Sequence, residues 1–139
     1  MPTESEWEYA ARGGASDTPS LYSGSNTAGD VAWYTVNVVD KNVQPIGGKA
    51  ENQLHIYDMS GNAWEWVADW YNTYSAKAQT NPVGLSDDEA DAASITQKVR
   101  RGGGWADNDA KTLRVSGRGV NEPSTRSGSV GFRFAKSAQ

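Results

Sequence analysis

The stretch Tyr57-Asp58-Met59-Ser60-Gly61-Asn62-Ala63-Trp64-Glu65-Trp66 places a tight polar turn directly before a run of large rings. Its Ser-Gly-Asn centre is typical of a turn, because these residues tolerate the backbone angles that turns need. Tryptophan and alanine then alternate with Glu65, Val67 and Asp69, and this period of two predicts a strand. Three of the six tryptophans lie between Trp64 and Trp70. Such a density of rings requires a specific packed scaffold, since no generic strand needs it.

Outside this stretch the predicted elements are short. Thr3-Glu4-Ser5-Glu6 has the spacing of a capping box and predicts a helix from Glu4 to Arg12 that Gly13-Gly14 ends. A polar excursion over 72–94 contains a second helix start at Ser86-Asp87-Asp88-Glu89. The remaining predictions are a strand or ordered loop over 31–39 and short strands over 99–101, 113–115 and 131–135. Short elements joined by irregular loops predict a loop-rich α+β fold with short antiparallel strands.

Composition limits the classes of function. With 139 residues, of which 37% are hydrophobic, the chain is predicted to form one domain over residues 1–139. It has no cysteine, which excludes disulfides, thiolate metal sites and thiol nucleophiles. The net charge is −4 and the basic residues are spaced singly, so no nucleic-acid partner is expected. No apolar run approaches the ~20 residues of a membrane span, so no membrane insertion is expected.

Three blocks of the chain resemble one known family. The segment from Pro2 to Gly14, the stretch from Tyr57 to Trp66, and the ending formed by Arg101-Gly102-Gly103-Gly104-Trp105, Arg114, Arg118 and Gly131-Phe132-Arg133 are similar to motifs of the formylglycine-generating, or sulfatase-modifying factor, superfamily. That superfamily is a branch of the C-type lectin fold, so the resemblance implies this fold. Family domains usually carry a further segment before the first motif, so the resemblance also implies an N-terminally short version of the domain or part of a longer protein.

The resemblance does not extend to the family's chemistry. The oxidases of the superfamily carry two cysteines shortly after the glycine block, at positions that fall near Asp107 and Thr112 here. Their thiolates bind the copper that activates oxygen, and neither aspartate nor threonine replaces them. The expectation is therefore a protein that does not synthesise formylglycine, is not an enzyme and binds no copper.

The segment 101–133 most closely resembles the variable proteins of diversity-generating retroelements, which use this fold to display a mutagenised surface. Small polar runs alternate with framework residues, and every residue type in the runs is reachable from an asparagine codon by changing only its adenines. The resemblance implies a protein or cell-surface ligand. The implied ligand-binding positions are Trp105, Ala106, Asp107, Asn108, Thr112, Ser116, Gly119, Val120, Asn121, Ser127, Gly128 and Ser129. Ordinary loops have the same composition, and this alternative stays open.

Calcium is the metal that the sequence favours, because it prefers carboxylate and carbonyl oxygens in a flexible turn. Asp58 and Glu65 flank the Ser-Gly-Asn turn, and the resemblance adds the carbonyls of Gly61 and Ala63 as ligands. In the alternative, Asp58 caps the turn and Glu65 pairs with an arginine such as Arg101, since a buried glutamate needs a partner in either case.

Several alternatives remain at this stage. The chain is either a display protein, a noncatalytic C-terminal part of a larger formylglycine-generating-enzyme-like protein, or a carbohydrate-binding lectin. His55, the only histidine, is predicted to be a surface or turn residue. The first residues, Met1-Pro2-Thr3-Glu4, lack a basic and then apolar leader, so no export signal is expected within this sequence. A signal that was removed or lies upstream stays an alternative, and the resemblance is compatible with display outside the cell or on a phage or cell surface.

Overall fold

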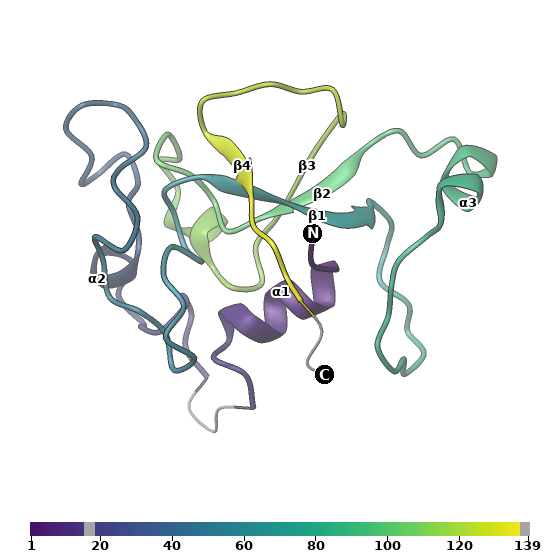
Figure 1. The fold of residues 1–139 in the computed structure, drawn as a ribbon, viewed down its shortest axis with the longest axis horizontal. Helices are drawn as coiled ribbons and strands as arrows, with labels where there is room; N and C mark the ends of the chain where they lie inside the picture. The colour runs from purple at the N-terminus through teal and green to yellow at the C-terminus, as the bar shows by residue number, and fades with distance from the viewer. Residues whose placement is uncertain (16–18, 137–139) are drawn as a thin grey trace.

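One face of a small sheet packs against the first helix, and loops cover most of the rest of the molecule (Figure 1). The computed structural model describes residues 1–15 and 19–136. The four-stranded sheet has the order β3-β2-β1-β4. Its strands are β1 (Trp64–Trp70), β2 (Lys98–Arg101), β3 (Arg118–Asn121) and β4 (Val130–Phe132). No helix in the described ranges is long and apolar enough to cross a membrane.

Helix α1 (Glu4–Ala11) forms as predicted. The Thr3 hydroxyl accepts a hydrogen bond from the Glu6 amide at 3.2 Å, and the Glu6 carboxylate accepts one from the Thr3 amide at 2.8 Å. These two bonds complete the capping box. Trp7 and Ala11, one turn apart, are both buried against the sheet.

The alternation in β1 divides the sheet into two unlike faces. Val67 lies in the core with α1, and Glu65 and Asp69 contact α1 through Trp7 and the Glu4 amide. Because successive side chains of a strand point to opposite faces, Trp64 and Trp66 lie on the other face. We call this second surface the outer face. The opposite surface of the sheet, which carries Glu65, Val67 and Asp69, is the inner face. The core between this face and α1 consists of Trp7, Ala11, Met59, Val67, Val99 and Val115.

The Ser60-Gly61-Asn62 turn joins loops that are distant in sequence. The Ser60 hydroxyl donates to the Leu113 carbonyl at 2.8 Å. The Asn62 amide donates to the Trp33 carbonyl at 2.8 Å, and the Asn62 carbonyl accepts from the Trp105 amide at 2.8 Å. This turn therefore holds the loop before β1 against the loop that follows β2.

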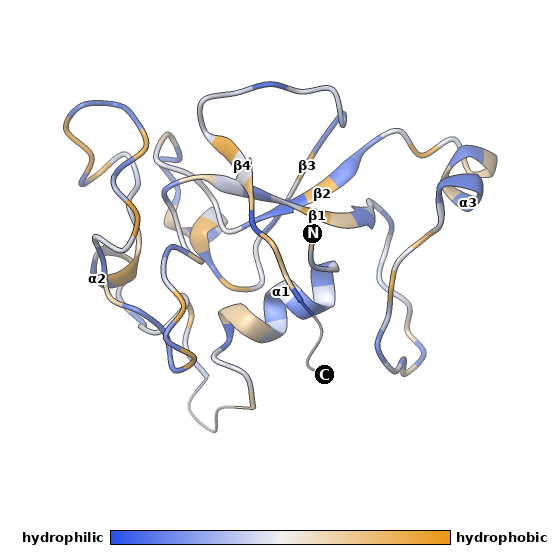
Figure 2. Cartoon of the chain, in the orientation of Figure 1, coloured by the Kyte–Doolittle hydropathy of each residue, from blue (hydrophilic) through white to orange (hydrophobic). Residues whose placement is uncertain are grey.

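The predicted surface excursion is confirmed. Residues 71–81 are exposed, and α3 (Asp87–Ala92) begins with a second capping box, formed by Ser86 and Glu89. Figure 2 shows this helix as largely hydrophilic. Only Ala90 of α3 is buried, so the helix contributes little to the core.

The strand predicted over 113–115 is wrong. Residues Ala110–Leu113 form a 3₁₀ helix, η1, because the Asp109 side chain caps it by accepting from the Lys111 amide. Leu113 packs in a second core cluster with Tyr22, Ala28, Val31 and Ala32. The segment 31–39, for which a strand and a loop were both possible, begins with the last residue of α2 (Ala28–Val31) and continues as a loop over 32–39.

The arrangement of the last two strands also differs from the prediction. No strand was predicted over Arg118–Asn121, where β3 lies and pairs with β2 in the antiparallel sense. Strand β4 pairs with β1 in parallel, with Trp64 opposite Val130. The expectation of antiparallel strands is wrong for this pair, because the loop 122–129 returns over the sheet and brings β4 in beside the start of β1 (Figure 1).

Candidate ligand-binding face

The outer face carries cationic side chains stacked on tryptophans. The Arg100 guanidinium lies 4.4 Å from the centre of the Trp64 ring, and the Lys98 ammonium lies 4.1 Å from that of Trp70. Gly119 is the register partner of Arg100 on β3. A Cβ at Gly119 would come within 2.8 Å of the Trp64 ring, so the ring and the strand are in close contact there. Such stacking fixes the rings and the cations together.

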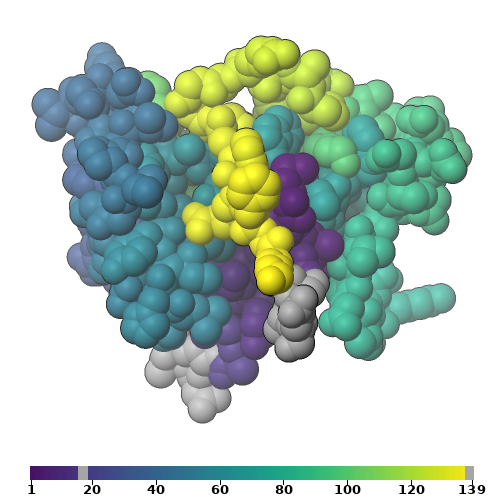
Figure 3. Space-filling view, viewed as in Figure 1, coloured from purple at the N-terminus to yellow at the C-terminus, as the bar shows by residue number. Residues whose placement is uncertain are grey.

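Two loops of the predicted binding region meet beside Trp64. The Trp64 amide donates to the Ser129 carbonyl at 2.8 Å. The Trp105 indole donates to the Gly128 carbonyl at 3.4 Å. The Gly104 amide donates to the Asp107 carboxylate at 2.7 Å and closes the first loop. In Figure 3 the segment before β4 forms an arch at the top of the molecule, the same side on which Figure 1 places this loop.

The predicted ligand-binding positions fall into two groups. The outer face brings together Trp105, Asp107, Gly119, Gly128 and Ser129, through the contacts just described. Exposed neighbours on the same two loops are Ala106, Asn108 and Ser127. Asn121 lies at the end of β3 and donates to the Thr125 hydroxyl at 3.2 Å.

Three predicted positions lie elsewhere. Val120 pairs with the buried Val99 and therefore faces the core side, because cross-strand partners point the same way. Thr112 lies in η1, where its hydroxyl donates to the Asp109 carbonyl at 2.8 Å. Ser116 lines a different cavity of about 1200 Å³ beside α1 and the 71–85 loop. The twelve positions therefore do not form one continuous surface.

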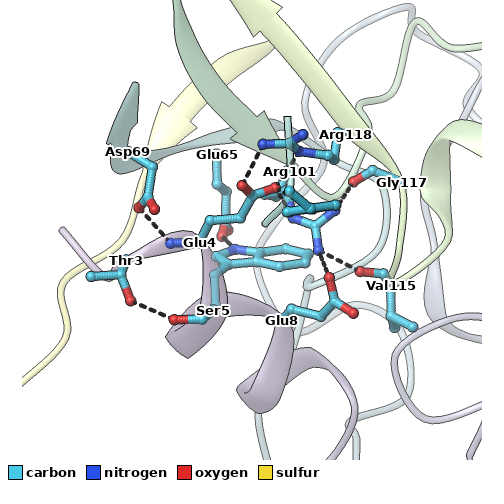
Figure 4. A network of polar contacts seen from close by, with 12 residues as sticks. Thr3, Glu4, Ser5, Glu8, Glu65, Asp69, Arg101, Val115, Gly117 and Arg118 are labelled. Atoms are coloured by element: carbon cyan, nitrogen blue, oxygen red, sulfur yellow. Dashed lines mark hydrogen bonds and ion pairs between the residues drawn. The ribbon is translucent and has the colours of Figure 1, made fainter. Parts of the chain in front are cut away.

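A buried ion-pair network fixes the sheet on α1 (Figure 4). The Arg101 side chain is completely buried and forms ion pairs with Glu4 and Glu8. It also donates to the Val115 carbonyl at 2.9 Å and to the Gly117 carbonyl. Arg118 donates twice to Glu4, at 2.7 Å each. Two arginines of the C-terminal motifs, Arg101 and Arg118, thus join the sheet to α1.

The two carboxylates among the four predicted calcium ligands already have protein partners. Glu65 accepts from the Trp7 indole at 2.6 Å and from the Arg133 guanidinium at 2.7 and 2.5 Å. The partner is thus Arg133 rather than Arg101. Asp58 accepts from the Gly47 amide at 2.8 Å and lines a cavity of about 620 Å³ with Ala63 and Glu65. A calcium ion bound by Glu65 would have to displace Arg133, so the set as it stands does not fit the ion, and the calcium site stays a prediction.

Asp107 and Thr112, which the resemblance places near the family's copper-binding cysteines, make turn contacts. Asp107 accepts from the Gly104 amide, and Thr112 donates to the Asp109 carbonyl. Neither side chain offers a soft sulfur ligand, so these residues do not fit a thiolate copper site.

Two further residues complete the description. His55 has a positive φ of 59° and its ring contacts Glu51 at 2.7 Å, so it is the turn residue that was predicted. Sequence reasoning missed Arg100. The signal was present, because in a strand two adjacent arginines must point to opposite faces, and Arg101 occupies the inner one.

Comparisons with known proteins match nearly the whole chain to one family. Residues 1–138 match the family model for the sulfatase-modifying factor enzyme 1-like domain. The formylglycine-generating enzyme of Streptomyces coelicolor is 32% identical over 99% of this chain and 46% of its own length. The inactive C-alpha-formylglycine-generating enzyme 2 of Bos taurus is 31% identical over 99% of this chain and 44% of its own length.

The structure of Treponema denticola variable protein 1 superposes with a TM-score of 0.80, at 32% identity over 95% of this chain and 45% of that protein. The chain thus spans less than half the length of these relatives. The predicted resemblance to the superfamily and to variable proteins is confirmed, and so is the loop-rich α+β fold class. The chain belongs to the sulfatase-modifying factor, or formylglycine-generating enzyme, family and has its C-type-lectin-like fold.

Proposed function

We propose that the protein is a noncatalytic display protein of the diversity-generating retroelement type, which binds a protein or cell-surface ligand through the outer face. One observation carries the proposal: the 104–108 and 127–129 loops meet beside Trp64, where the Ser129 carbonyl accepts from the Trp64 amide and the Gly128 carbonyl accepts from the Trp105 indole. The exposed Ala106 and Asn108 side chains make none of these contacts, so they are exchangeable without loss of the loop geometry. The Ser127 hydroxyl accepts from the Ser129 amide at 3.2 Å, a contact within its own turn. The similarity to Treponema denticola variable protein 1 supports the same function.

The network around Arg101 and the stacked tryptophans suit such a role. A binding surface that is rigid before the ligand arrives loses less conformational entropy when it binds. The fixed sheet thus supports the exposed loops, and the loops contact the ligand.

The test of display is to sequence several copies of the locus with their surroundings. We expect a nearby reverse transcriptase gene and a template repeat that is almost identical to the codons of 101–133. Differences between repeat and gene should lie at template adenines, in codons such as those of Ala106, Asn108 and Ser127. Codons that are identical in all copies, or differences spread evenly along the gene, would contradict display.

The absence of catalysis has a separate test. The protein is incubated with a cysteine-containing sulfatase-motif peptide, copper and oxygen, and the peptide is analysed by mass spectrometry. The Streptomyces coelicolor formylglycine-generating enzyme is the positive control. We expect the peptide cysteine to stay unmodified, because the chain has no cysteine to supply the thiolates that bind copper. Conversion above the protein-free control would refute the noncatalytic assignment.

The second candidate is a noncatalytic part of a larger formylglycine-generating-enzyme-like or carbohydrate-binding protein. The observation that favours it is the share of the relatives that the chain spans, 46% and 44% for the two enzymes named above. Reading the complete open reading frame separates the two candidates. A glycan array with and without a calcium chelator tests the carbohydrate arm, where calcium-dependent binding is the supporting result.

A further inference from the structure

Arg100 has a charge without an acidic partner. Arg12, Arg101, Arg118 and Arg133 each form an ion pair with a glutamate. Within the described ranges the Arg100 side chain forms no ion pair and no hydrogen bond, and its Nε, like that of Arg114, is buried without a partner. Burial lowers the pKa of its guanidinium, but an arginine stays charged at neutral pH. A partly buried and unpaired charge is costly, so this side chain favours an incoming anion.

The fold holds Arg100 in place for such an anion. One side of the guanidinium stacks on the Trp64 ring at 4.4 Å. A Cβ on Gly119 would lie 2.9 Å from Nε and 2.8 Å from the Trp64 ring, so β3 packs closely against the stacked pair. Asp107 is the acidic residue whose charge acts on Arg100, but its carboxylate accepts from the Gly104 amide at 2.7 Å and stays within its own loop.

We propose that Arg100, stacked on Trp64, is a fixed anchor that binds a carboxylate of the ligand, while the exposed loop residues beside it read the surrounding surface. The assignment rests on the proposed function of the outer face. Arg100 belongs to strand β2, and its stacked guanidinium is hydrogen-bonded to neither loop. It therefore keeps its position when the side chains of the loops change. An anchor of this kind gives a common first contact to ligands that differ elsewhere.

The charge at the site favours a carboxylate over a phosphate. Arg100 supplies one positive charge, which Asp107 partly offsets, so a singly charged anion is the better match. The register neighbours Trp66 and, beyond it, Phe132 add apolar surface, and an exposed fraction of 59% leaves Phe132 open to a partner. Apolar surroundings lower the local dielectric constant and strengthen a charge-assisted hydrogen bond.

Nuclear magnetic resonance of the arginine Nε–H groups tests the anchor directly. The ¹⁵N-labelled protein is titrated with the capped peptide Gly-Glu-Gly, with its Gly-Gln-Gly counterpart and with inorganic phosphate. The Arg100 resonance is assigned by its absence in R100K. We expect it to shift saturably with the glutamate peptide, which should bind at least about tenfold more tightly than the glutamine peptide. The Arg133 resonance, whose Nε is bound by Glu65, is the internal control and should not move.

The variants complete the test. R100Q should abolish the binding of the glutamate peptide. R100K should weaken the binding of the glutamate peptide, because lysine keeps the charge but loses the planar fork. If R100Q does not fold, R100K is the variant that tests the anchor. The anchor is wrong if the Arg100 resonance does not move, if both peptides bind equally, or if phosphate binds more tightly than the glutamate peptide. Locus sequencing tests the display function independently of the anchor. If Arg100 binds no carboxylate, the display function is not affected. If the locus does not vary, the carboxylate site at Arg100 is not affected.

Discussion

At the scale of one residue, the turn before β1 depends on Gly61. Its φ is +76°, and a Cβ there would lie 2.4 Å from the Trp33 carbonyl oxygen. Both the left-handed backbone and the close contact oppose any side chain. We predict that G61A lowers the free energy of unfolding by about 3 kcal/mol, measured by urea denaturation.

The matched control is Gly128, because no atom lies within 4 Å of a Cβ built there. G128A should change the free energy of unfolding by less than about 0.5 kcal/mol, as surface substitutions usually do. Equal losses in both variants would show that the Trp33 contact is not the cause.

Arg133 decides the calcium prediction at the same scale. It is bonded to Glu65 at 2.7 and 2.5 Å and repels any cation at that carboxylate. We predict that R133Q increases the calcium affinity at least about tenfold, measured by isothermal titration calorimetry. R12Q, which removes a cation that pairs with Glu8 at the surface, should leave the affinity unchanged. If neither wild type nor R133Q binds calcium, the calcium site is wrong.

At the scale of elements, Arg101 connects α1 to β2. Its side chain is completely buried and faces Glu4 and Glu8, so its removal leaves carboxylates without a full partner. We predict that R101Q costs about 3 kcal/mol of stability, because breaking a buried ion pair strands a charge. The less buried i,i+4 pair of Arg12 and Glu8 gives the comparison, since Glu8 keeps Arg101 as a partner in R12Q and the variant should cost less than about 0.5 kcal/mol. Similar thermal denaturation of the two variants would contradict the account of how α1 docks.

The elements also show how far sequence patterns predict this fold. The capping boxes specify α1 and α3 locally, and period-two alternation specifies β1, because these signals lie within the element itself. Strand β3 carries no such signal: Gly119 and Asn121 are poor strand formers, and their conformation comes from pairing with β2. The parallel pairing of β4 depends on the path of the 122–129 loop, which no local pattern encodes.

At the scale of the whole molecule, the sequence predicts the range of residues that contains the candidate binding face, but not which of these residues lie together in space. The order of motifs indicated residues 101–133, and two of its loops do meet beside Trp64. Ser116 lies instead at the cavity beside α1, and Val120 pairs with the buried Val99, because the turn after η1 and the pleat of β3 direct them there. Arg100 was missed, since two adjacent arginines in a strand point to opposite faces, but which of them lies on the outer face follows only when the partners of Arg101 are known.

The central claim is that a fixed scaffold holds a replaceable surface. The most direct measurement is the protease resistance of a cell-displayed library in which Ala106, Asn108, Ser127 and Gly128 are randomised together. A matched library randomises four buried core positions, Trp7, Met59, Val67 and Val99. The account predicts that most members of the surface library stay as resistant as the wild type, whereas few members of the core library do. A surface library that loses resistance as widely as the core library would contradict it.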